Sequence, residues 1–200
     1  MGIFLALKEM WRSRGRFILV SLVIALITVL VLFIAGLTEG LGNGNREYLS
    51  KLNADLVVYK SNVDLSIATS RVDRSTYNDI RLVPGVKDAG PISFSNVSVM
   101  LGGDKTLGVS LIGVDPGRPG EPPVVVGRGL GDRSAKEVVL DRNVALRTGL
   151  KAGDNLRIKT IQGTKEEYYN LRVVGISDGR QHFLQPSIFV PALTFDRVKP

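Results

Sequence analysis

The sequence predicts an α+β protein in which one N-terminal transmembrane helix precedes an extracytoplasmic domain of two small α+β lobes. Three observations lead to this class. Phe17–Thr38 is apolar and carries no charge, the chain after it shows short strand patterns separated by turn signals, and one or two helical patterns interrupt the strands. None of the 200 residues is Cys, so the outer domain is expected to be held together by packing, without disulfides.

The apolar run Phe17–Thr38 is predicted to be a transmembrane helix. At about 1.5 Å per residue it would be roughly 33 Å long, against about 30 Å for the hydrocarbon core of a bilayer. Its polar residues Ser21 and Thr28 can each bond a carbonyl one turn earlier. A secretory signal peptide is the alternative, but its apolar core usually has only about 7–15 residues, which favours an uncleaved anchor.

Residues 1–16 are predicted to form a cytoplasmic amphipathic leader on the membrane surface, with an unstructured basic leader as the alternative. Four basic residues precede the span: Lys8, Arg12, Arg14 and Arg16. The first charge beyond the span is Glu39. The positive-inside rule therefore keeps the N-terminus in the cytoplasm and places residues 39–200 outside, with the lipid bilayer as a partner of the chain.

Residues 39–52 are predicted to be a stalk-like connection. Glycines recur every four residues at Gly36, Gly40 and Gly44, and we expect them to mark a flexible or fraying helix end more than a close-packing face. A helical stripe nevertheless continues to about Lys51. Its members are Leu41, Tyr48, Leu49 and Leu52.

The extracytoplasmic domain, residues 53–200, is expected to begin with a strand at Asn53–Tyr59. Val72–Val83 then predicts a helix, with Asp73 or Ser75 as its N-cap and Pro84-Gly85 as its stop. The alternating residues of Phe94–Leu101 and the return segment Leu107–Val114 predict a hairpin around Gly102-Gly103-Asp104.

A second block begins at Val124, and its elements are again short. Arg142–Thr148 predicts one or two helical turns, and Leu193–Val198 predicts the start of a helix. The predicted strands are Val138–Leu140, Leu156–Ile161, Tyr168–Ile176 and Pro186–Pro191. Gln162-Gly163-Thr164 joins the middle two as a second hairpin.

The net charge of +7 does not indicate nucleic-acid binding, because the basic residues outside the membrane are scattered and are not interleaved with aromatics. The glycines of Val126–Gly131 do not match a dinucleotide fingerprint, because position 132 is Asp, and they are predicted to form a loop. No phosphate-binding Gly-x-x-x-x-Gly-Lys-Ser/Thr loop occurs, so the chain is not expected to be an ATPase by itself.

No residue is predicted to be catalytic, to bind a cofactor or to ligate a metal. His182 is the only histidine and is expected to be a solvated loop residue. Four aspartates beside glycine, proline or turn signals are expected to bond local backbone amides: Asp115, Asp132, Asp141 and Asp154. The chain is therefore not expected to be an enzyme.

Several segments together resemble the MacB/FtsX-type permeases of ABC transporters, and the leader and span look most like the haem-exporter and DevC-like branches. Each segment alone is a weak match to the family, but the order and spacing of the segments together are specific. The segments are Leu52–Val58, Ile80–Pro91, Leu111–Pro116, Val126–Leu130, Glu137–Leu140, Leu150–Asp154 and Val173–Ile176.

This resemblance implies a permease protomer with four membrane helices, of which the first precedes a MacB-like periplasmic core domain. The chain would be the N-terminal part, with three further helices and a coupling loop after Pro200. Two protomers, expected as a homodimer, would pair with ABC ATPase subunits in the bacterial inner membrane and drive efflux. The family offers no catalytic residue and no cofactor.

Two alternatives of other classes follow from the same residues. A single-pass sensor or adaptor would bind a ligand or an envelope protein through its outer domain. A membrane-tethered enzyme would need a convergent polar pocket with perturbed titratable groups. Three more apolar runs of about 20 residues in the same reading frame would favour the permease over the adaptor.

Overall fold

The computed structural model describes residues 13–63, 67, 69–103, 105–179, 181–182 and 185–200. Most of the predicted leader 1–16 lies outside these residues. The chain divides into two compact units, Met1–Asn43 and Gly44–Pro200, which are described separately.

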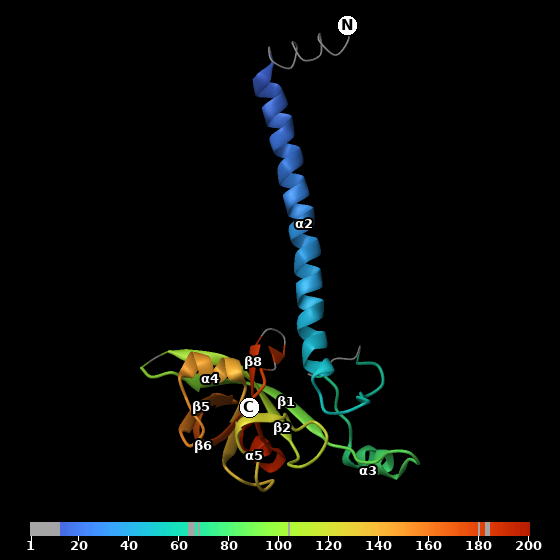
Figure 1. Ribbon diagram of the computed structural model, residues 1–200, viewed down its shortest axis with the longest axis vertical. Helices are drawn as coiled ribbons and strands as arrows, with labels where there is room; N and C mark the ends of the chain where they lie inside the picture. Colours follow the sequence, from blue (N-terminus) through green and yellow to red (C-terminus); the bar gives the residue numbers. More distant parts are fainter. Residues whose placement is uncertain (1–12, 64–66, 68, 104, 180, 183–184) are drawn as a thin grey trace. The chain divides into compact units, whose positions relative to one another are not determined.

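Helix α2, Arg14–Ser50, is one unbroken helix and contains the whole predicted span (Figure 1). Gly36, Gly40 and Gly44 lie inside it, so the prediction that they mark a frayed end is wrong. A glycine in a helix interior costs only about 1 kcal/mol relative to alanine, and α2 continues through these positions although Gly42, Asn43 and Asn45 lie beside them.

The predicted strand at Asn53–Tyr59 is absent, because this segment has no strand beside it to pair with. Leu56 is 84% exposed, and Val57 and Val58 are also exposed. Strand-forming residues stabilise a strand mainly through their cross-strand neighbours. The predicted helix, in contrast, is present as α3, Arg74–Leu82, with Asp73 at the N-cap and Val83 at the C-cap, just before Pro84.

Eight strands follow in the order β1 Ile92–Met100, β2 Thr106–Val114, β3 Val124–Gly127, β4 Glu137–Leu140, β5 Asn155–Gln162, β6 Lys165–Ser177, β7 Gln181–His182 and β8 Gln185–Pro191. Both predicted hairpins are confirmed, as β1–β2 and β5–β6. Strands β3 and β7 are not among the predicted strands, because four and two residues carry little periodic signal.

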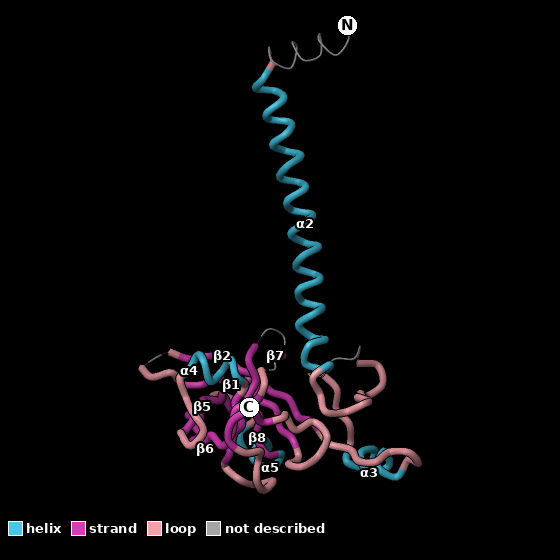
Figure 2. The backbone as a smooth tube through the Cα atoms, viewed as in Figure 1, coloured by secondary structure: helices cyan, strands magenta, loops and turns pink. Residues whose placement is uncertain are grey.

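Six of these strands close into a barrel in the order β2-β1-β5-β6-β4-β8, because β8 pairs again with β2. Figure 2 shows the strands of this domain gathered in one body. The β4–β6 and β2–β8 pairs are parallel and the other four are antiparallel. The α+β class is confirmed. The expected division into two lobes is not, since residues 44–200 form one unit around one barrel.

The barrel interior is filled by apolar side chains from all six strands. Along β2, Val109 and Leu111 belong to this interior cluster, whereas Ile112 and Val114 belong to a second cluster outside the barrel. This alternation is the period of two that a strand imposes. The interior strand residues are Val97, Val99, Val109, Leu111, Val138, Leu140, Leu156, Ile158, Leu171, Val173, Ile188 and Val190.

Two short helices lie at opposite ends of the barrel. Helix α4, Arg142–Thr148, follows β4, and helix α5, Ala192–Val198, follows β8. Because β4 and β8 are antiparallel, their carboxyl ends lie at opposite ends. Val144 of α4 and Phe195 of α5 join the interior cluster, so both helices complete the core.

Candidate functional site

The segment Arg14–Gly40 of α2 is long and apolar enough to cross a membrane, judged by its length and composition. Within its unit the large apolar side chains from Phe17 to Leu37 remain exposed, as expected for a helix that lipid would surround. Thr28 Oγ1 donates to the Ile24 carbonyl at 2.9 Å, which confirms the predicted bond to the preceding turn. This helix is the first part of the candidate functional site.

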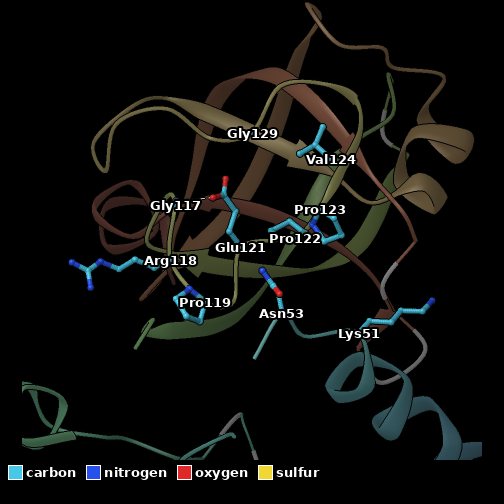
Figure 3. Close-up of a pocket in the computed structure, with 10 residues that line it drawn as sticks. All are labelled: Lys51, Asn53, Gly117, Arg118, Pro119, Glu121, Pro122, Pro123, Val124 and Gly129. Atoms are coloured by element: carbon cyan, nitrogen blue, oxygen red, sulfur yellow. Dashed lines mark hydrogen bonds between the residues drawn. The ribbon is translucent and has the colours of Figure 1, made fainter. Parts of the chain in front are cut away.

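The second part is a pocket of about 710 Å³ in the unit Gly44–Pro200 (Figure 3). Its lining residues are Lys51, Asn53, Gly117, Arg118, Pro119, Glu121, Pro122, Pro123, Val124 and Gly129. The Glu121 carboxylate accepts from the Gly117 amide at 2.6 Å and from the Leu130 amide at 3.0 Å, and Lys51 Nζ donates to the Gly179 carbonyl at 2.8 Å. The carboxylate of this pocket thus has a structural role in holding two loops.

Of the predicted loop Val126–Gly131, residues 126–127 belong to strand β3 and residues 128–131 form a loop, which two glutamates hold. The Leu130 amide is bonded to Glu121, and the Gly131 amide donates to Glu137 Oε2 at 3.0 Å. A Cβ on Gly127, whose φ is +86°, would lie 2.4 Å from the Val174 carbonyl oxygen. Gly127 therefore allows a close approach to β6. Two amides that a phosphate could have used, those of Leu130 and Gly131, are already occupied.

Glu137 also forms a two-point ion pair with Arg128, through Arg128 Nη1 at 3.0 Å and Nη2 at 2.5 Å. The hydrogen bond from Arg128 is the main reason that the pKa of Glu137 is lowered, and partial burial opposes it. The same pair raises the pKa of Arg128. Both groups are thus charged at neutral pH and fasten the start of the loop to β4.

The predicted turn role holds for two of the four aspartates. Asp132 accepts from the Arg133 amide and Asp154 from the Lys151 amide, each at 2.8 Å. Asp141 is the N-cap of α4 but makes no side-chain cap bond, and it accepts from Asn143 Nδ2 at 3.2 Å.

The prediction is wrong for Asp115, which is buried and pairs with arginines. Its Oδ1 accepts from Arg133 Nε at 2.9 Å, and its Oδ2 lies 3.9 Å from Arg118 Nε. Sequence reasoning missed this network because Arg133 is distant in the chain. One sequence signal for a cluster of arginines was available: Arg74 and Arg81 are seven residues apart, which puts both on one face of α3. In the structure both line a second pocket together with Asp115.

His182 lies in the two-residue strand β7 beside β8, so its backbone is in a strand and not in the predicted loop. Among the residues that the structure describes, no three side chains of His, Asp or Glu gather as metal ligands would. The described barrel is thus a packed body whose polar groups mainly fasten loops to strands.

The chain matches a known protein family over most of its length. Residues 17–199 match the sequence profile of the MacB-like periplasmic core domain. A candidate hemin transport system permease protein, HrtB, of Staphylococcus haemolyticus (strain JCSC1435) is 34% identical over 79 residues. That stretch is 40% of this chain and 22% of the relative, so the chain matches about a fifth of that protein's length.

Two solved structures are also similar in part. The extracellular domain of the noncanonical ABC-type transporter YknZ from Gram-positive bacteria matches with a TM-score of 0.46 and 13% identity, over 62% of this chain and 64% of that one. The periplasmic region of MacB from Actinobacillus actinomycetemcomitans matches with a TM-score of 0.44 and 18% identity, over 60% and 55% of the two chains.

Proposed function

This chain belongs to the MacB-like periplasmic core domain family of ABC transporter permeases, and from that membership we propose that it is the N-terminal part of a permease subunit that exports its substrate from a bacterial cell. In this proposal the chain binds no nucleotide. It moves its outer domain when a partner ATPase binds and hydrolyses ATP in the cytoplasm.

The continuity of α2 is the observation that carries the proposed mechanism. The helix contains the whole apolar segment Arg14–Gly40 and continues to Ser50 without a break. A hydrogen-bonded helix resists compression along its axis, so it can transmit a rigid-body shift across the bilayer to the domain that follows. A flexible linker at Gly40–Gly44 would absorb the same shift.

The proposed orientation places the N-terminus in the cytoplasm and the barrel outside. Its support is the charge distribution, since Arg14 and Arg16 begin α2 whereas Glu39 follows the apolar run. The barrel needs no disulfide because its interior is filled by apolar side chains from six strands and two helices.

The proposed partners are an ABC ATPase subunit and a second permease protomer. ATP hydrolysis is assigned to the partner because the glycine loop of this chain is closed by its own glutamates: Glu121 and Glu137 occupy the amides of Leu130 and Gly131. The Staphylococcus relative is named for hemin transport, which makes hemin the first substrate to test.

Export from vesicles tests this function. The permease that contains this chain would be reconstituted with its ABC ATPase in inverted vesicles, and ATP-driven hemin uptake would be measured. Inserting Gly-Gly after Leu49 rotates the following residues by about 200° and loosens the helix. We expect uptake to fall severalfold while the ATPase still co-purifies.

The matched control is the same Gly-Gly insertion after Gly163, in the exposed turn between β5 and β6, which should leave uptake unchanged. Normal uptake with the Leu49 insertion would reject transmission through a stiff helix. ATP hydrolysis by the purified 200-residue chain alone would reject the permease assignment itself.

A further inference from the structure

A second pocket, of about 300 Å³, lies between α3 and the segment that follows β2. Its lining residues are Arg74, Tyr77, Asn78, Arg81, Asp115, Arg118 and Arg133. Four guanidinium groups thus face one carboxylate, and the lining has a net positive charge. Converging cations repel one another unless an anion lies between them, so this lining favours a bound anion.

Asp115 holds two of the four arginines in place through ion pairs. It is only 4% exposed, and it pairs with Arg133 and Arg118 through the Nε atom of each. Pairing through Nε leaves the terminal nitrogens of Arg133 available, and among the described residues no acceptor binds them. Arg133 therefore keeps a two-pronged donor group at the pocket.

Arg118 has a different role from Arg133, because its Nη1 atom already donates hydrogen bonds within the protein. This atom donates to Asp88 Oδ1 at 2.9 Å, to the Tyr77 hydroxyl at 3.3 Å and to the Ala89 carbonyl at 3.4 Å. The Tyr77 hydroxyl in turn donates to the Ala89 carbonyl at 3.0 Å. Arg118 and Tyr77 therefore fasten α3 to the barrel and define the wall of the pocket.

Arg74 and Arg81 complete the lining from α3. In the described part of the chain no carboxylate pairs with either of them, although Arg81 lies over the Tyr77 ring at 5.9 Å from its centroid. Helix α3 also has no buried residue, so these two arginines do not serve a packed helix face. Among the described residues, the carboxylate of this pocket, Asp115, is paired with Arg133 and Arg118 and not with these two arginines.

We propose that this pocket binds the oxyanion group of a small molecule, a phosphate or a carboxylate. Arg74, Arg81 and the terminal nitrogens of Arg133 bind the anion, while Asp115 and Arg118 position the site. The planar guanidinium fork matches both oxyanions and forms paired hydrogen bonds with them. The small volume fits such a group, and the site does not depend on the proposed export function.

Titration calorimetry of the full chain in phosphatidylcholine nanodiscs tests the site, with inorganic phosphate and citrate as probes at low salt. We expect Arg74→Gln and Arg81→Gln each to weaken phosphate binding by about tenfold or more, because each removes a charged donor pair. Arg81→Lys keeps the charge and should weaken it less. Arg147→Gln, on the exposed face of α4, is the matched control and should bind phosphate like the parent chain.

Dihexanoylphosphatidic acid, a soluble lipid analogue, distinguishes the two sources of a phosphate group. Binding at least about tenfold tighter than inorganic phosphate assigns the site to a lipid headgroup, and equal binding assigns it to a free oxyanion. Failure of all three probes to bind at millimolar concentration would overturn the proposal. An equal loss in Arg147→Gln would overturn it too, since binding would then follow net charge. Thermal unfolding of each variant checks that it is folded.

Discussion

Gly113 of β2 lies directly against Phe195 of α5: a Cβ atom on Gly113 would be 2.7 Å from both Cβ and Cγ of Phe195. Phe195 is part of the barrel interior and is nearly fully buried. The absence of a side chain at Gly113 is therefore what lets α5 close its end of the barrel.

Gly113→Ala is expected to destabilise the barrel domain by about 1–3 kcal/mol, because the added methyl group overpacks the contact with Phe195. The midpoint of chemical denaturation, compared between the variant and the parent chain, measures this loss of stability. Gly108→Ala in the same strand is the control, since a Cβ there would meet nothing within 4 Å. Equal loss in both variants would mean that strand propensity, and not the Phe195 contact, decides the effect.

Glu137→Gln is expected to cost about 1 kcal/mol at pH 7. It weakens the bonds to Arg128 and to the Gly131 amide, and the exposure of Arg128 limits the effect. Chemical denaturation at pH 7 measures the change in the free energy of unfolding. Glu166→Gln should change stability less, because the Glu166 side chain is 51% exposed whereas that of Glu137 is 17% exposed. A larger loss of stability in Glu166→Gln than in Glu137→Gln would contradict the conclusion that Glu137 holds the loop in place.

The stability advantage of the parent chain over Glu137→Gln should also depend on pH. Arg128 lowers the pKa of Glu137 in the folded state, so the folded protein favours the ionised carboxylate more than the unfolded chain does. The advantage is thus fully present above the ordinary carboxyl pKa of about 4.3, and it is lost as pH falls through the lowered value. Denaturation curves between pH 7 and pH 3 measure it, and a constant difference would reject the linkage.

Asp115→Asn is expected to lower stability by about 1–2 kcal/mol, because it leaves the Nε donors of Arg133 and Arg118 without their buried anion. Asp132→Asn is the comparison, since Asp132 is exposed and bonds only within its turn. Thermal unfolding ranks the two variants. A smaller shift for Asp115→Asn than for Asp132→Asn would show that the arginine network contributes little.

Single cysteines test the orientation, because the chain has no Cys of its own. We expect a membrane-impermeant thiol reagent to label Ser61→Cys in intact cells and to label Ser13→Cys only after the membrane is broken. The reason is the basic flank before the span. The opposite labelling pattern would show that the orientation is the reverse of the proposed one. The proposed coupling between a cytoplasmic ATPase and the barrel domain would then have no basis.

The sequence by itself determined the elements that depend on neighbouring residues. The apolar run Phe17–Thr38 determined the membrane-length part of α2, and the alternating residues around Gly102-Gly103 and Gly163 determined both hairpins. Arg142–Thr148 was predicted with the bounds that α4 has. In each case a local period or a turn signal carries the information.

The tertiary structure alone decided how distant segments meet. The parallel β2–β8 pair closes the barrel, and nothing local in either strand announces its partner. Leu56 and Val58 have the composition of a strand but remain exposed because no strand lies beside them. The same holds for the candidate site: Asp115 reads as a turn residue until folding brings Arg133 to it, since a charge pair between residues far apart in the chain depends on where the backbone places them.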